Sequence, residues 1–251
     1  MNDFTITGDY VLPSLGKVYK EEIDPHITLR SMTTAEEMRR MSNTEFPNKA
    51  MSEIIDECIV SGPKMSVYDM CMADYLYLMF KLRIVTYGSE YTISTICPYC
   101  THQNINDIDL NDLYIQEFDS KLYDYMSFEL PRTKKHITLQ LQTPRMLDNI
   151  EEQVKRYKQK ARKSKVDPQL LYNLMSLIDT VDGSKINPLE LEDWIRNLPM
   201  MDVQTIIAYA DKLNNFLGID KKMEVTCDVC KIPHNTSFRF SGDFFRPTLD
   251  I

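Results

Sequence analysis

Two short cysteine motifs, roughly 125 residues apart, constrain the fold of this chain more than any other feature of its sequence. Each motif follows a segment that alternates apolar and polar residues, and each is followed by a polar return segment (90–96 and 101–109; 223–226 and 236–240). This pattern predicts two β-hairpins, each with a Cys-x-x-Cys tip. Four thiolates supplied in two such pairs complete the tetrahedral shell of a structural zinc ion. The predicted ligands are Cys97, Cys100, Cys227 and Cys230.

Other uses of these cysteines are less consistent with the pattern. A thioredoxin-like redox pair belongs at a helix N-terminus, and a catalytic zinc needs an open coordination position that four thiolates do not leave. Free thiols remain an alternative, because compact zinc ribbons commonly close with about 15–20 intervening residues. His102 and His234 follow the two motifs and could replace a thiolate, although exposed or supporting roles are favoured. Cys58 and Cys71 lie in apolar helical patterns, so we expect them to pack in the core.

Composition excludes several classes of protein. The chain has 251 residues with 43% hydrophobic and 26% charged, so it can build a core without metal, and zinc would organise one region. A net charge of -8 disfavours a protein that coats nucleic acid. The basic stretch 155–165 is interpreted as a solvated helix face, with an acidic partner as the alternative. No apolar run approaches the roughly 20 residues of a membrane span, and no leader precedes the chain, so we expect a cytoplasmic product.

Enzyme motifs are also missing from the sequence. With seven glycines there is no phosphate-binding loop, and neither HExxH nor GxSxG occurs. Carboxylate groups at 36–37, 151–152 and 190–193 fit the first turns of helices, where negative charge is favourable. We therefore predict a protein that is not an enzyme. The Met200-Met201 and Phe244-Phe245 pairs could face a partner or lie in the core.

Periodicity predicts an α+β fold, mainly helical, with short β-hairpins forming a zinc ribbon from the two distant knuckles. In the first region, 1–115, strands are expected at 4–7, 10–12 and 27–30, and helices from Thr33, at 48–59 and at 67–87, where Gly88 ends the last. The second region, 116–220, is an inserted helical subdomain with strands at 125–130 and 136–141 and helices at 148–163, 167–179, 188–197 and 202–217. The third region, 221–251, carries the hairpin that completes the ribbon.

The order of these elements resembles the baseplate hub and hub-assembly proteins of T-even-like contractile-tailed bacteriophages. The resemblance is carried by short stretches in a fixed order: Leu12-Pro13-Ser14-Leu15-Gly16, 29–37 (LRSMTTAEE), Leu82-Arg83, Tyr87-Gly88, Cys97-Pro98-Tyr99-Cys100, Ile108-Asp109-Leu110 and 227–247. It covers the first 115 residues or so best and the last 30 or so next. The helical insertion matches nothing in that family that we can name.

The resemblance implies a structural or assembly component of the tail baseplate hub, with other tail proteins, and possible copies of itself, as partners. It implies a location in the virion baseplate, or in the host cytoplasm during assembly. The zinc prediction comes from the cysteine pattern and not from the resemblance. A nucleic-acid-binding zinc ribbon is the main alternative, although Lys231 and Arg239 supply little positive charge beside the knuckles. An enzyme of unrecognised type is a further alternative.

Overall fold

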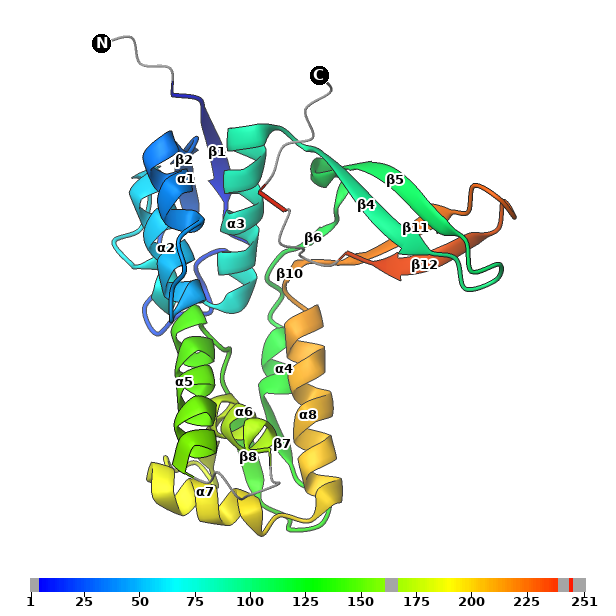
Figure 1. Cartoon of the computed structure of the whole chain (residues 1–251). Helices are drawn as coiled ribbons and strands as arrows, with labels where there is room; N and C mark the ends of the chain where they lie inside the picture. Colours follow the sequence, from blue (N-terminus) through cyan, green and yellow to red (C-terminus); the bar gives the residue numbers. More distant parts are fainter. Residues whose placement is uncertain (1–4, 161–166, 239–243, 246–251) are drawn as a thin grey trace.

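The computed structural model describes residues 5–160, 167–238 and 244–245. Figure 1 shows three parts: a body that contains the first helices, a column of helices beneath it, and an arm that projects to one side. Within the described residues, eight α-helices and five small antiparallel sheets make a mixed α/β fold. The prediction of helices combined with short hairpins is confirmed, whereas the division at residues 115 and 220 stays a prediction.

The body is a three-stranded sheet packed against helices. Its elements are β1 (Thr7–Val11), β2 (His26–Arg30), α1 (Thr34–Arg40), α2 (Pro47–Cys58), β3 (Ile59–Ser61), the 3-10 turn η1 (Val67–Asp69) and α3 (Met72–Tyr87). β2 is the central strand, because Ile27 pairs with Tyr10 of β1 and Thr28 pairs with Ser61 of β3. α3 is apolar around its circumference, as expected for a helix that protein surrounds, and its Leu78 and Leu82 are fully buried.

The predicted helix at 67–87 is wrong at its start. Ser66 does cap a helical turn, accepting a hydrogen bond from the N–H of Tyr68 at 3.3 Å, but that turn is η1. The backbone is then extended at Met70 and Cys71, and α3 begins at Met72. The N–H of Met72 donates to the carbonyl of Gln142 at 2.9 Å. A contact with a distant segment therefore interrupts an apolar pattern that is continuous in the sequence. Gly88 ends α3 as predicted, with φ of 90°.

A buried carboxylate holds the turn that follows β1. Asp74 of α3 is fully buried and accepts hydrogen bonds from the N–H of Ser14 at 3.0 Å and the hydroxyl of Tyr19 at 2.6 Å. Gly16 has φ of 72°, and a Cβ there would lie 2.0 Å from the carbonyl oxygen of Ile23. Only glycine fits this turn, which explains the Leu-Pro-Ser-x-Gly pattern.

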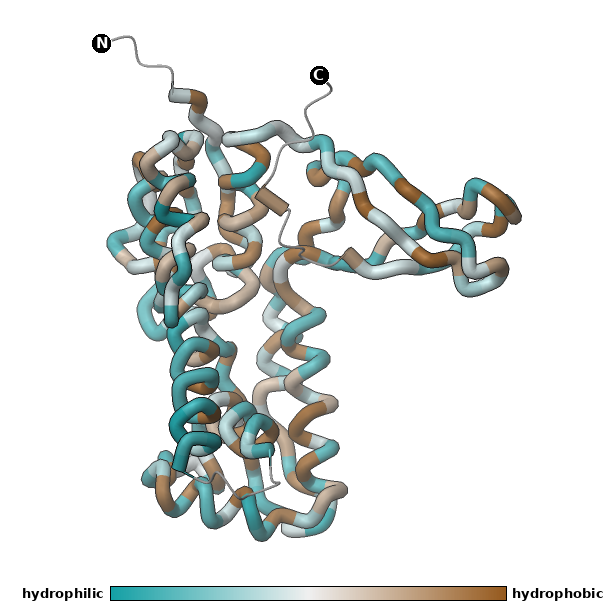
Figure 2. The backbone as a smooth tube through the Cα atoms, in the orientation of Figure 1, coloured by the Kyte–Doolittle hydropathy of each residue, from teal (hydrophilic) through white to brown (hydrophobic). Residues whose placement is uncertain are grey.

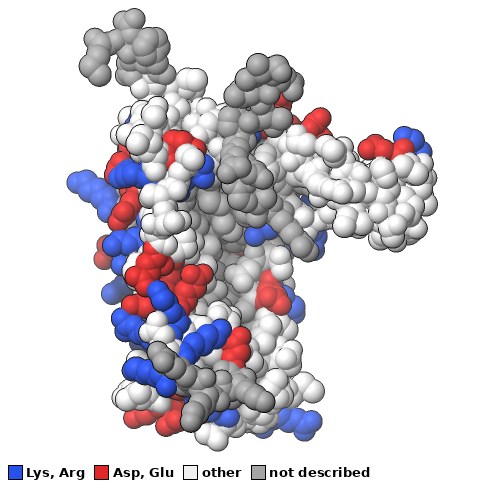
Figure 3. Space-filling model, viewed as in Figure 1, with Lys and Arg blue, Asp and Glu red and all other residues white. Residues whose placement is uncertain are grey.

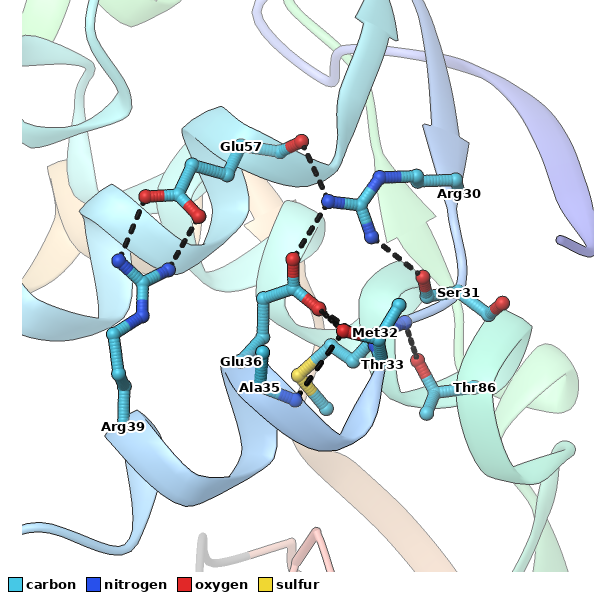
Figure 4. A network of polar contacts seen from close by, with 9 residues as sticks. All are labelled: Arg30, Ser31, Met32, Thr33, Ala35, Glu36, Arg39, Glu57 and Thr86. Atoms are coloured by element: carbon cyan, nitrogen blue, oxygen red, sulfur yellow. Dashed lines mark hydrogen bonds and ion pairs between the residues drawn. The ribbon is translucent and has the colours of Figure 1, made fainter.

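The start of α1 is fixed by a polar network that joins β2, α1 and α2 (Figure 4). Thr33 and Glu36 form the predicted capping box, in which the N–H of Thr33 donates to Glu36 Oε2 at 2.7 Å. Arg30 Nη2 donates to Glu36 Oε1 at 2.7 Å and to the carbonyl of Glu57 at 3.1 Å. The Arg30 guanidinium, helped by Thr33, lowers the pKa of Glu36 to about 2.

The column beneath the body is the insertion between the two hairpins of the arm. Its elements are η2 (Leu110–Asp112), β6 (Ile115–Gln116), α4 (Leu122–Met126), β7 (Ser127–Glu129), β8 (His136–Leu139), α5 (Pro144–Lys160), α6 (Gln169–Leu177), β9 (Ile178–Val181), α7 (Pro188–Arg196), α8 (Met200–Asn215) and β10 (Gly218–Ile219). The helices at 188 and 200 lie close to their predicted positions. β9 was missed, since Leu177 and Ile178 continue one buried apolar run that periodicity cannot divide.

The insertion is closed at its own base and is fixed to the body by buried polar groups. Its ends meet, because Gln116 of β6 pairs with Gly218 of β10. Asp148 of α5 is 1% exposed, and its carboxylate accepts the N–H of Lys49 at 2.8 Å and the hydroxyl of Tyr68 at 3.0 Å. Lys49 lies in the first turn of α2, where a negative charge is favourable.

Two details of the insertion bear on the sequence prediction. α5 begins at Pro144, not near 148, so the carboxylates of Glu151 and Glu152 lie beyond its first turn. In the basic stretch, Lys155 pairs with Glu45 at 2.5 Å and Arg156 with Glu152 at 2.5 Å, while residues 161–166 lie outside the described part. The helix-face interpretation holds for the described residues.

Arg83 of α3 connects the body, the base of the arm and the C-terminal segment. It is 1% exposed, and its guanidinium donates to the carbonyls of Gly88, Glu90 (2.9 Å) and Phe244 (3.3 Å). Phe244 and Phe245 are themselves buried, whereas Met200 and Met201 are 60% and 54% exposed. The phenylalanine pair therefore belongs to the core, and the methionine pair lies at the surface.

We expect Arg83→Met to lower the free energy of unfolding by about 3 kcal/mol, because three buried carbonyls lose a charged donor. Chemical denaturation measures the change. Lys81→Met is the control on the same helix; its ammonium lies 5.5 Å from the centre of the Tyr10 ring, and its loss should cost less than about 1 kcal/mol. Equal losses in the two variants would contradict a connecting role for Arg83.

Glu36→Gln should make the free energy of unfolding less dependent on pH in the acid range. The folded pKa of Glu36, about 2, lies below its ordinary 4.5, so its ionised form stabilises the fold above about pH 4.5 and this contribution is lost as the pH falls toward 2. The variant should be about 2 kcal/mol less stable than the native chain at pH 7, and the gap should narrow below pH 4. Glu53→Gln, at an exposed site on α2, should change stability by less than about 0.5 kcal/mol at either pH. A gap for Glu36→Gln that did not change with pH would refute the assigned pKa.

Candidate metal centre

The arm consists of two antiparallel hairpins from distant parts of the chain. Hairpin 1 comprises β4 (Glu90–Ile96) and β5 (Gln103–Asp109), and hairpin 2 comprises β11 (Lys222–Thr226) and β12 (Pro233–Ser237). Ile96 pairs with Gln103, and Thr226 with Pro233, so a Cys-x-x-Cys motif forms each tip as predicted. The return strand of hairpin 2 begins three residues earlier than the sequence pattern suggested. Figure 1 shows the two hairpins together, projecting from the body.

The two tips have the same backbone geometry. In hairpin 1 the N–H of Thr101 donates to the carbonyl of Cys97 at 2.9 Å, and in hairpin 2 the N–H of Lys231 donates to the carbonyl of Cys227 at 3.0 Å. Thr101 and Lys231 both have left-handed backbones, with φ of 59° and 58°. Two non-glycine residues held in this sparsely populated region at matching positions indicate that the tips are specified for a common purpose.

The four sulfur atoms converge at the tips. Cys97 Sγ lies 3.7 Å from Cys230 Sγ, and Cys100 Sγ lies 3.5 Å from Cys227 Sγ. All four sulfurs lie within 4.8 Å of one another, so they are close enough to hold one metal ion. An ion bound tetrahedrally at about 2.3 Å from each sulfur would set the sulfurs about 3.8 Å apart. The donor set therefore fits a tetrahedral metal ion, while the ligand roles of these cysteines stay a prediction.

The electrostatics of the thiols favour a cation between them. Burial raises the pKa of the Cys227 thiol, but hydrogen bonds from the N–H groups of Cys230 and Val229 outweigh it and leave that pKa at about 6. The N–H of Ile232 lowers the pKa of Cys230, yet burial and the neighbouring sulfurs raise it to about 12. The Cys227 thiol thus loses its proton readily, whereas the neighbouring sulfurs oppose the loss of a proton from Cys230. A divalent cation would remove this opposition, because metal binding requires deprotonated thiolates and compensates their charge.

Two buried residues beside the cysteine cluster, Asn104 and His234, were not identified from the sequence as a pair. Asn104 and His234 each lie four residues beyond the second cysteine of their hairpin, and they are 1% and 7% exposed. Asn104 Oδ1 accepts the N–H of Asp228 at 3.0 Å and so links hairpin 1 to the tip of hairpin 2. The equal spacing from the two motifs was the available signal. His234 is buried beside its tip and not among the four converging groups, and His102 is exposed.

The remaining cysteines behave as the sequence suggested. Cys58 and Cys71 are 0% and 4% exposed, and burial raises the pKa of both thiols, that of Cys58 to about 11. Such thiols stay protonated and pack as small apolar groups. The prediction of core positions is confirmed.

Fold and site together define a mixed α/β protein in which four cysteines join two segments that are distant in the sequence. The chain belongs to the family described as T4 bacteriophage base plate protein, whose model matches residues 4–246. This confirms the resemblance to phage baseplate proteins, and it implies a place in the phage tail and contacts with other tail proteins. Comparisons with curated proteins and with solved structures gave no match. Among the described residues, no helix has the length and apolar character needed to cross a membrane.

We expect Cys97→Ser and Cys227→Ser each to reduce the metal content of the purified protein from about one ion per chain toward zero, because removing one thiolate opens the coordination shell. Elemental analysis measures the metal, and hydrogen exchange should show faster exchange in β11 and β12. Cys58→Ala is the matched control, since it removes a buried thiol outside the arm and should leave the metal content unchanged. A parent protein without metal, together with unaltered exchange in both serine variants, would refute the centre.

Proposed function

We propose that this chain is a structural or assembly component of the baseplate hub, stabilised by Zn²⁺ bound to Cys97, Cys100, Cys227 and Cys230, and that it acts through contacts with other tail proteins. The observation that carries the proposal is the family match over residues 4–246 in a chain whose four cysteines converge from two distant segments. The hub role comes from the resemblance in the sequence, and the metal from the geometry of the arm.

Zinc is the favoured metal for chemical reasons. Thiolates are soft ligands, and a tetrahedral set of four sulfurs is typical of zinc or of iron. Zinc has no redox chemistry, and a closed shell of four thiolates leaves no position for a substrate. Such a site supports a structural role, because its contribution is to hold hairpin 1 against hairpin 2.

The charge of the arm supports a protein partner over nucleic acid. The described part of the arm and its base carries more carboxylates than ammonium groups: Glu90, Asp107, Asp109, Glu224 and Asp228 against Lys221, Lys222 and Lys231. Affinity for phosphate depends on clustered positive charge, which this surface does not offer. We therefore place the function in protein contacts.

A phage that carries Cys97→Ser or Cys227→Ser in this gene should yield fewer complete baseplates than the parent phage, because the arm loses its metal and hairpin 2 loosens. Electron microscopy of lysates counts the baseplates, and immunoblots locate the protein in tails and tail precursors. Cys58→Ala should assemble normally. Absence of the native protein from tails and from every tail precursor throughout assembly would reject the proposed function.

A further inference from the structure

The two hairpins of the arm share their tip geometry but differ on their outer faces. On hairpin 1, the outward residues near the tip include Ile96 and Ile105, which are 70% and 69% exposed, and the exposed Gln103 opposite Ile96. The positions that correspond to the isoleucines on hairpin 2, one residue before the first cysteine and five after the second, are Thr226 and Asn235. The same scaffold therefore carries two exposed isoleucines on one side and polar residues on the other.

The strand register makes the two isoleucines neighbours. Ile96 pairs with Gln103 and Ile105 pairs with Ser94, so the isoleucines are diagonal neighbours on one face of a two-stranded ribbon. The tip adds the ring of Tyr99, which is 63% exposed. In Figure 2 the arm carries apolar segments out to its far end, away from the body and the insertion. Burial within the chain does not explain these side chains, since the inner face of the same hairpin already supplies Tyr91 and Thr95 to the interior.

Carboxylates follow the isoleucines along the same face. The outward positions toward the base of hairpin 1 are Asp107, Asp109 and Glu90, and Glu90 lies directly opposite Asp109 in the register. Like charges in this position destabilise a sheet. Asp107 accepts the hydroxyl of Thr92 at 2.7 Å. The N–H of Asn111 and the hydroxyl of Ser89, with a smaller contribution from the charge of Lys81, lower the pKa of Asp109. Figure 3 shows charged side chains crowded along α2 and α5, where ion pairs are frequent, but sparse on the arm.

We propose that the outer face of hairpin 1 is a docking surface for an extended segment of another baseplate protein, with apolar side chains that cover Ile96 and Ile105 and Lys or Arg that reach the carboxylates. Four residues separate Ile105 from Asp109, which is about 13 Å along a strand, so the segment should carry its basic residues about four positions from its apolar ones. This inference rests on the proposed function, because it names the partner surface of a baseplate component. A basic partner would offset the repulsion between Glu90 and Asp109, which face each other in the register.

A second copy of this chain is a poorer occupant of the surface. Two copies of hairpin 1 can pair across a two-fold axis in two ways. Either the tips face each other and the bases face each other, or the tip of each copy faces the base of the other. The first arrangement brings carboxylates together, and the second covers isoleucines with carboxylates. Neither arrangement supplies the positive charge that the face lacks.

The test uses the full chain and an array of overlapping 15-residue peptides that cover the other baseplate proteins of the same phage. Four proteins are compared: the native chain, Ile96→Thr with Ile105→Asn, Asp107→Asn with Asp109→Asn, and the control Thr226→Ser with Asn235→Ser on hairpin 2. The first double variant gives hairpin 1 the side chains that hairpin 2 carries at the same positions. Metal content and thermal unfolding are measured on all four, so that a misfolded arm is recognised.

The proposal expects the native chain to bind peptides that combine apolar residues with at least two Lys or Arg. The isoleucine double variant should bind them about tenfold more weakly or worse, as for truncated residues at the centre of an interface. The aspartate double variant should bind more weakly at low salt and lose most of its salt dependence, and the control should match the native chain.

Several results would overturn the proposed docking surface: no peptide bound, bound peptides without basic residues, binding unchanged in both hairpin 1 variants, or self-association that the isoleucine variant abolishes. Immunoblots of tails separate this failure from failure of the proposed function. If the protein is found in tails or their precursors while the array is negative, the docking surface alone is wrong. If it is found in neither, the proposed function is wrong whatever the array shows.

Discussion

The structure depends on the convergence of two pairs of cysteines. Hairpin 1 follows α3, and hairpin 2 follows the whole insertion, so the contacts at the tips close a loop that contains most of the helices. Closing a long loop costs chain entropy, and the cost grows only slowly with loop length. Four sulfur ligands on one ion can offset that cost, whereas the small apolar area between two two-stranded hairpins offers much less.

The rest of the molecule is joined by buried polar groups that reach across the sequence. Asp74 holds the turn after β1, Asp148 fixes the insertion to α2, and Asp202 accepts the N–H groups of Arg132 and Thr133 at 2.8 and 2.9 Å. Arg83 is instead a donor, and it donates to carbonyls of the arm and of the C-terminal segment. A buried charge is tolerated where several hydrogen bonds satisfy it, and removing its partners is costly. Among these contacts, those of Arg83 link the body to the base of the arm at Glu90.

The two hairpins of the arm differ on their outer faces, although their tips are alike. Both hairpins hold their cysteines in the same tip geometry, as the matching left-handed residues Thr101 and Lys231 indicate. On the strands, exposed isoleucines lie beside carboxylates only on hairpin 1, whereas the exposed apolar residues of hairpin 2, Val229 and Ile232, lie at its tip. Contact with another protein would remove the apolar side chains of such a surface from water and would place positive charge near its carboxylates. The arm thus combines four converging cysteines at its tips with an exposed face that carries isoleucines and carboxylates.

The sequence by itself determined the two hairpins, the four cysteines and the cap of α1 at Thr33, because spacing, capping and turn chemistry are local properties. It also determined the family resemblance of about the first 115 and the last 30 residues. It did not determine that α3 starts at Met72, since a hydrogen bond to Gln142 from the insertion breaks a continuous apolar pattern. It left open whether Phe244 is buried and Met200 exposed, because both are apolar and only packing decides. The meeting of sulfurs more than 120 residues apart, at 3.5 and 3.7 Å, was likewise decided by tertiary structure, since the path of the intervening chain is not encoded in either motif.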